Sequence, residues 1–173
     1  MKVFGLVGWS GSGKTTLMIE LVPELVRRGL KVSTMKHTHH NFDIDKRGKD
    51  SYEHRRAGAT EVMVASSARW ALMHELRAEP EEDMQALIDR MTPVDLLLIE
   101  GFKRHKHPKM EIHRPVTGKE LLAAGDESIV AVATDGELDG LRQPQLDLND
   151  VPAIADFILK YCGLSVDQTS GAA

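Results

Sequence analysis

A glycine-rich stretch near the start of the chain limits the folds that are open to it. Residues 8–16 read GWSGSGKTT, a full match to the pattern G-x-x-x-x-G-K-[ST]. The pattern needs a buried strand before it and a helix after it, and apolar residues 3–7 and the periodic segment 14–28 supply both. Together these features predict a loop whose inward-pointing backbone N–H groups hold a polyphosphate at the start of a helix.

Three side chains of this loop have expected partners on the ligand. The ammonium of Lys14 should reach the β- and γ-phosphates, and the Thr15 hydroxyl should bind Mg²⁺. The Thr16 hydroxyl, one step later, is a candidate for the α-phosphate. The alternative interpretation is a glycine-rich turn that only connects two elements. Backbone amides complete the predicted phosphate site, from Gly8, Ser10, Gly11, Ser12 and Gly13.

Short apolar runs alternate with helical patterns along the rest of the chain. Helices are expected over 14–28, over 50–58 with Asp50 as its cap, from Pro80 onward, and over 152–161. Alternating helices and nearly continuous apolar strands indicate an α/β fold, a P-loop NTPase-like mostly parallel sheet with helices on both faces. The strands are expected at residues 3–7, 31–36, 61–65, 71–74, 96–100 and 129–133, with a shorter one at 109–113.

Composition and charge narrow the function classes. The chain has 173 residues and no proline- or glycine-rich linker, so a single domain is expected over 1–166, with a flexible tail at 167–173. The net charge of −4 argues against nonspecific nucleic-acid binding. No apolar run approaches the roughly 20 residues that a membrane span needs. The single cysteine, Cys162, excludes an internal disulfide and fits a cytoplasmic protein.

A carboxylate at the end of another strand is the expected partner of the metal. Residues 94–101 read VDLLLIEG, so Glu100 follows four apolar residues, where P-loop proteins place the acid that contacts Mg²⁺. The loop after the second strand supplies Asp43 or Asp45, either of which could bind or orient the metal shell. Asp45 or Glu100 is also the candidate to orient the attacking water, with Mg²⁺ and Lys14 stabilising the developing charge.

The segment MKHTHHNFDIDKRGKDS, residues 35–51, also concentrates histidines. His37, His39 and His40 are dense enough to suggest a transition-metal site. Their H-x-H-H spacing matches no standard zinc pattern, and no CxxC accompanies them. The metal site therefore stands beside a simpler interpretation, in which these histidines make polar loop contacts or are solvated.

A basic stretch follows Glu100 immediately. Residues 101–109 read GFKRHKHPK, which is a local basic patch on an otherwise acidic chain. The patch either docks an anionic ligand or acidic partner beside the nucleotide, or is a solvated connecting loop. Its basic side chains are those of Lys103, Arg104, Lys106 and Lys109.

Residues 132–137, VATDGE, end the last long strand and hold a candidate for base recognition. The Asp135 carboxylate could accept hydrogen bonds from guanine N1–H and from the guanine 2-amino group. The usual [NT]-K-x-D guanine motif is not present, and a turn-forming Asp-Gly pair is the alternative interpretation.

Several motifs, taken in order, resemble the MobB family of molybdopterin-guanine dinucleotide biosynthesis adapter proteins. They are WSGSGKTTL, KHTHH, DKRGKDSYEHRRAGA, RWALM, EGFK and, before the last helix, DLNDV. The first motif is shared by a very large superfamily, whereas KHTHH and GKDSYEHRRAGA in this order are far more specific. The similarity runs from the first predicted strand to the end of the chain.

The resemblance implies a GTP-binding protein with at most slow GTP hydrolysis, working in molybdenum cofactor biosynthesis. It also implies a homodimer that assists the guanylyltransferase joining GMP to molybdopterin, without being that transferase. Molybdopterin itself is a further candidate ligand. Carried over by position, residues 8–16 would hold the phosphates, and Asp45 and Glu100 would lie near the metal.

Two other functions stay open on the residues alone. The same phosphate loop serves ATP-dependent small-molecule kinases, in which arginines usually close over the phosphates. Arg55, Arg56 and Arg104 are available for this, although the chain has no distinct lid insertion. The other alternative is a metal-delivery GTPase that uses the histidines of residues 37–40.

Overall fold

The fold was analysed in a computed structural model that describes residues 1–38 and 42–165. The chain divides into two compact units. The first unit contains residues 1–37 and the chain from residue 91 onward, and the second contains residues 38–90. The expected tail, 167–173, lies outside the described residues. No helix in the described part of the chain is long and apolar enough to cross a membrane.

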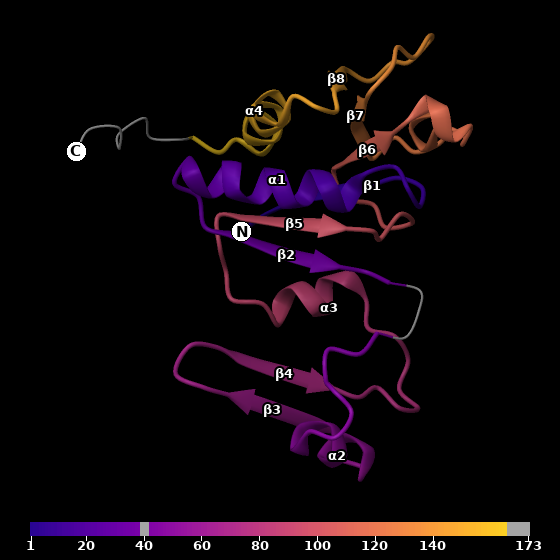
Figure 1. The fold of residues 1–173 in the computed structure, drawn as a ribbon. Coiled ribbons are helices and arrows are strands. Elements are labelled where there is room, and N and C mark those ends of the chain that lie inside the picture. The colour runs from indigo at the N-terminus through magenta and orange to yellow at the C-terminus, as the bar shows by residue number, and fades with distance from the viewer. Residues whose placement is uncertain (39–41, 166–173) are drawn as a thin grey trace, which may run out of the picture. The chain divides into compact units, whose positions relative to one another are not determined.

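A six-stranded sheet forms the centre of the first unit (Figure 1). Its strand order is β2-β5-β1-β6-β7-β8, and every pair of neighbours is parallel. Because the strands run the same way, their carboxyl ends meet at one edge, which we call the carboxyl edge. The strands are β1 (Lys2–Val7), β2 (Val32–Lys36), β5 (Leu96–Glu100), β6 (Lys109–His113), β7 (Ile129–Thr134) and β8 (Gln145–Asp147).

Two helices, α1 (Lys14–Arg27) and α4 (Val151–Cys162), pack against each other on one face of this sheet (Figure 1). Alternate strand residues face the two helices, as the two-residue period of a strand requires. The other face carries a smaller core, part of which comes from the 3₁₀ turn η2 (Leu122–Ala124). The main core includes Phe4, Leu6, Leu17, Leu21, Leu25, Leu96, Leu98, Met110, Ile112, Ile154 and Ile158.

The second unit holds an antiparallel hairpin of β3 (Glu61–Ala65) and β4 (Trp70–His74), with the short helices α2 (Asp50–Arg56) and α3 (Met84–Asp89). Both strands were predicted in the sequence, but they form a sheet of their own instead of joining the parallel one. The reason is the connection over 66–69, which is long enough for a hairpin and far too short for a parallel crossover.

Three local predictions differ from the structure. Asp50 is the first helical residue of α2, and Lys49 occupies the cap position without a side-chain cap bond. Helix α3 begins at Met84, later than Pro80, because the Asp83 carboxylate accepts a hydrogen bond from the Ala86 backbone N–H, 2.8 Å away. Strand β8 was not predicted, since three residues are too few to show a strand period.

Candidate phosphate-binding site

The phosphate loop runs from the end of β1 to the start of α1, at the carboxyl edge. Gly8 lies against β6, where a Cβ atom would come within 2.4 Å of the Ile112 carbonyl oxygen. Gly13 has φ +98° and begins α1 in the left-handed region. Both positions therefore require glycine. Ser10, Gly11 and Thr16 are exposed around the loop and the first helical turn, and Ser12 is buried.

Lys14 is half-buried beneath the loop. Its ammonium donates a hydrogen bond to the Trp9 carbonyl oxygen at 2.8 Å and approaches Ser12 Oγ at 3.5 Å. Burial lowers the pKa of Lys14, while the Glu100 carboxylate raises it and the ammonium groups of Lys103 and Lys36 lower it further. The Lys14 charge is thus held in a poorly solvated place, where a phosphate oxygen would stabilise it.

Thr15 and Glu100 meet across the carboxyl edge. The Thr15 hydroxyl donates a hydrogen bond to Glu100 Oε1 at 3.2 Å. Lys36, the last residue of β2, lies with its Nζ 3.4 Å from the same carboxylate oxygen. A hydroxyl and a carboxylate are hard oxygen ligands of the kind that Mg²⁺ prefers, so the pair fits the predicted metal site.

Arg114 joins the phosphate loop to the end of β7. Its Nε donates to the Ser12 carbonyl oxygen at 3.3 Å, and its Nη1 donates to Asp135 Oδ2 at 2.5 Å. The predicted base-reading carboxylate therefore lies at the carboxyl edge, paired with an arginine that contacts the loop. Arg114 was not identified from the sequence, because its partner Ser12 is 102 residues away in the chain.

The lysines of the predicted basic patch, residues 101–109, do not all lie at the surface. Lys109 is 1% exposed and does not belong to a surface patch. Its Nζ donates to the carbonyl oxygens of Lys103 at 3.1 Å and His105 at 2.7 Å, and lies 2.9 Å from Asp126 Oδ2. A lysine can be buried this way because three oxygen atoms replace its water shell. Lys103 instead lies over the Trp9 ring, with Nζ 4.4 Å from the ring centre.

His107 belongs to the same basic segment, residues 101–109, and is 6% exposed. Neither ring nitrogen has a hydrogen-bond partner among the described residues. Burial, assisted by the nearby charge of Lys109, lowers the pKa of His107 to about 4. The imidazole is therefore neutral at pH 7 and acts as a packing group.

The predicted carboxylates of the histidine–aspartate segment lie in the second unit. Asp45 Oδ1 accepts a hydrogen bond from Ser51 Oγ at 2.8 Å, and Oδ2 lies 3.9 Å from Arg55 Nε. Arg55 also pairs with Asp43 at 2.6 Å and Glu75 at 3.1 Å. Arg55 is therefore held by three carboxylates, which weakens the case for it as a kinase arginine.

Of the three candidate histidines, His37 lies in the first unit, with its ring centre 4.5 Å from that of Phe102. His39 and His40 lie outside the described residues. Within residues 1–38 and 42–165, no group of three or more histidine, cysteine, aspartate or glutamate side chains could hold a metal ion.

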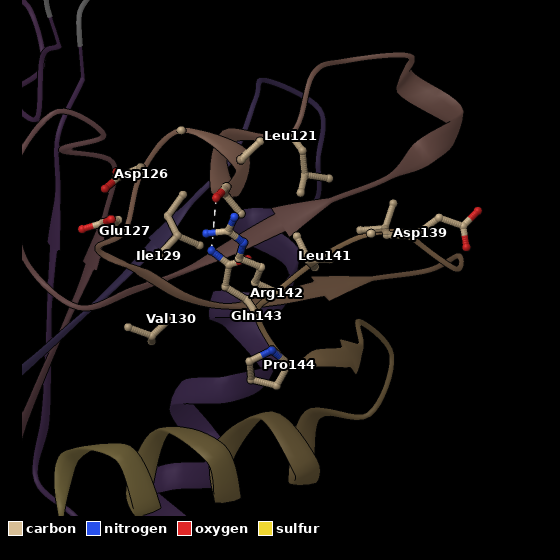
Figure 2. A pocket seen from close by; sticks show the side chains of 15 residues that line it. Leu121, Asp126, Glu127, Ile129, Val130, Asp139, Leu141, Arg142, Gln143 and Pro144 are labelled. Atoms are coloured by element: carbon tan, nitrogen blue, oxygen red, sulfur yellow. Dashed lines mark hydrogen bonds between the residues drawn. The ribbon is translucent and has the colours of Figure 1, made fainter.

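A hollow of about 860 Å³ is lined by residues between 121 and 144 and by none of the phosphate loop (Figure 2). Its walls come from η2, the start of β7 and the segment that leads into β8. Gln143 crosses it and donates a hydrogen bond from Nε2 to the Ala123 carbonyl oxygen at 3.1 Å (Figure 2). The apolar part of the lining includes Leu121, Ala123, Ile129, Leu138, Leu141 and Pro144.

The parallel six-stranded sheet agrees with what comparisons with known proteins show. The family described as molybdopterin guanine dinucleotide synthesis protein B, MobB, matches residues 3–135. This chain belongs to the MobB family. The P-loop NTPase-like fold is shared by a crystal structure of molybdopterin-guanine biosynthesis protein B, with a TM-score of 0.70 and 28% identity, covering 92% of this chain and 99% of that one.

Two relatives of the MobB-family chain carry the name molybdopterin-guanine dinucleotide biosynthesis adapter protein. The protein from Escherichia coli K12 is 45% identical over 164 residues, covering 92% of each chain. The protein from Haemophilus influenzae is 44% identical, covering 90% of this chain and 86% of that one. The similarity therefore extends over nearly the whole of each protein.

Proposed function

We propose that this MobB-family chain is an adapter that binds GTP with Mg²⁺ in molybdopterin-guanine dinucleotide biosynthesis. It would assist the guanylyltransferase and hydrolyse GTP slowly at most. The observation that carries the proposal is the phosphate loop with Lys14 beneath it and the Thr15–Glu100 pair beside it. The names of the two relatives support the adapter role.

The charges around the loop suit a metal-bound triphosphate. Lys14 and Lys36 both interact with the Glu100 carboxylate, so two positive charges surround one negative charge at the site. Backbone N–H groups of residues 8–13 and the start of α1 add partial positive charge. When bound, Mg²⁺ would be held by Thr15 and Glu100 and would neutralise charge on the β- and γ-phosphates.

Asp135 is the residue we propose for reading guanine. Arg114 bonds its Oδ2 atom, and Oδ1 accepts no hydrogen bond from the described residues. Asp135 Oδ1 can accept a hydrogen bond from guanine N1–H or from the guanine 2-amino group. Adenine has an acceptor at N1 and no 2-amino group, so it would leave Oδ1 without a donor at these positions. Molybdopterin remains a further candidate ligand, for which we assign no residue.

The contacts of Glu100 support the proposal that hydrolysis is slow. A general base needs a free lone pair aimed at the attacking water. The Thr15 hydroxyl and the Lys36 ammonium both approach Glu100 Oε1, so this oxygen is already engaged and only Oε2 is left to orient an attacking water. Asp45 is the other proposed water-orienting residue, and its two oxygens lie beside Ser51 and Arg55.

Competition between nucleotides tests the proposal. A fluorescent GTP analogue bound in the presence of Mg²⁺ should be displaced by GTP at lower concentration than by ATP, with and without the guanylyltransferase. Failure to bind any purine triphosphate would refute the proposed function. Release of a phosphorylated small molecule, in reactions containing molybdopterin and either nucleotide, would instead establish the kinase alternative.

The homodimer is proposed to form through the β3–β4 hairpin. Register places Met63 opposite Leu72 and Ala65 opposite Trp70, so these four side chains share one face. Met63, Trp70 and Leu72 are 61%, 66% and 44% exposed. A two-stranded sheet with an uncovered apolar face is marginally stable in water, and a second copy of the hairpin would cover it.

Replacing Trp70 with glutamate should therefore weaken dimerisation by at least about tenfold, because a carboxylate would be buried without a partner. Sedimentation equilibrium measures this directly. Val116→Glu is the matched control, since Val116 is 88% exposed on the short turn after β6 and should leave the dimer intact. A dimer of unchanged strength in Trp70→Glu would contradict the assignment.

A further inference from the structure

The loop that follows Glu100 lies beside the phosphate loop because β5 and β1 are parallel neighbours. Their register pairs Leu6 with Glu100, so both strands end at nearly the same level. Lys103 is three residues beyond Glu100, and its ammonium lies 4.4 Å from the centre of the Trp9 ring. Trp9 is the second residue of the phosphate loop, so a charged side chain from the loop after β5 lies against the phosphate loop.

This arrangement places two ammonium groups near each other. The Lys14 ammonium donates to the Trp9 carbonyl oxygen at 2.8 Å, and the Lys103 ammonium lies over the ring of the same residue, so two positive charges meet at Trp9. Like charges held together cost free energy unless an anion lies between them. The electrostatics of Lys14 and Lys103 therefore favour a bound anion at this point.

The position of Lys103 is built into the loop. Phe102, before it, is 4% exposed and has φ +49°, a conformation that few non-glycine residues adopt. Buried Lys109 bonds the carbonyl oxygens of Lys103 and His105 and so fixes the backbone of this segment. Trp9 is held as well, since its indole Nε1 donates to the Glu120 carbonyl oxygen at 2.8 Å. Contacts within the protein therefore hold both the Lys103 backbone and the Trp9 ring in place.

We propose that Lys103 is a second phosphate-binding lysine, which contacts the terminal phosphate of the bound triphosphate from a resting position on the Trp9 ring. The inference rests on the proposed function and adds a residue to its site. The terminal phosphate is assigned because Mg²⁺ bridges the β- and γ-phosphates in such sites, and Lys103 follows the acid proposed to contact that metal. The flexible lysine stem lets the ammonium leave the ring face without movement of the fixed backbone.

The test compares GTP with GDP in the Lys103→Met variant of the full chain. Affinity for Mg²⁺–GTP, measured by calorimetry, should fall by roughly 10- to 100-fold, since a charge-assisted contact is lost. Affinity for GDP should change by less than about threefold, because only the screened field of Lys103 would be lost. Lys106→Met removes the same charge from an exposed position three residues later and should change GTP affinity by less than about threefold.

A spectroscopic readout keeps the result independent of folding. The chain has two tryptophans, so Trp70→Phe leaves Trp9 as the only indole. In that background GTP should change Trp9 emission as the ammonium leaves the ring, and Lys103→Met should remove most of the change. Equal losses for GTP and GDP, or unchanged GTP affinity in Lys103→Met, would overturn the inference alone. Absence of GTP binding in the unaltered protein would refute the proposed function and the inference together.

Discussion

Lys14→Ala is expected to lower the affinity for Mg²⁺–GTP by on the order of 100-fold, because the ammonium would contact two phosphates through charge-assisted hydrogen bonds. Calorimetry with the unaltered protein as reference measures the loss. The ammonium donates to the Trp9 carbonyl oxygen at 2.8 Å, and burial opposes its charge. Thermal unfolding without nucleotide should therefore occur at an unchanged or slightly higher temperature.

Glu100→Ala is the informative comparison for this variant. Glu100 bonds Thr15 and lies beside Lys36, but it would meet the triphosphate only through the metal. Glu100→Ala should therefore lower the affinity for GTP less than it lowers the slow rate of phosphate release. Full GTP affinity in Lys14→Ala would contradict the proposed site, and full turnover in Glu100→Ala would show that the acid takes no part in hydrolysis.

Lys109→Met is expected to lower the free energy of unfolding by about 3 kcal/mol, through the loss of a buried charge from its partners. The variant would leave the carbonyl oxygens of Lys103 and His105 without their donor, and Asp126 without its ion pair. Methionine fills most of the lysine volume, so the loss reports the polar contacts more than a cavity.

Urea unfolding followed by circular dichroism gives this free energy. Exposed Lys106, in the same loop, provides the control, because Lys106→Met should change stability by less than about 0.5 kcal/mol. Asp126→Asn breaks only the ion pair and leaves both carbonyl contacts in place, so its effect should be smaller than that of Lys109→Met. Equal stability of Lys109→Met and the unaltered protein would show that the buried ammonium contributes no net free energy.

Local patterns in the sequence predicted much of this fold. The apolar run 96–100 matches β5 residue for residue, because a strand buried on both faces is nearly all apolar. The shorter segment 109–113 matches β6 residue for residue, although three of its five buried side chains are polar or charged. The same rule predicted that 61–65 and 71–74 are strands, but could not assign them to a sheet. That assignment depends on connection length, which the apolar pattern does not contain.

The residues of the candidate site also fall into those that the sequence predicted and those that it did not. Glycine spacing predicted the phosphate loop, and the rule that P-loop proteins place an acid at the end of a neighbouring strand predicted that Glu100 lies near Thr15. Applied to Lys36 at the end of β2, the rule would also have found that lysine. Arg114 and Lys109 were beyond reach, because their roles depend on backbone oxygens that only the folded chain brings to them. The metal, base-reading and water-orienting roles remain predictions.

Strand β1 separates the start of the chain from the phosphate loop, because the two lie at opposite ends of this strand. Strand β1 has six residues, so Met1 lies about 20 Å from Gly8 along the strand axis. A purification tag, a fluorophore or a surface tether attached at Met1 would therefore sit well away from bound nucleotide. Immobilisation through that terminus should allow nucleotide and transferase to be titrated on the same captured molecules.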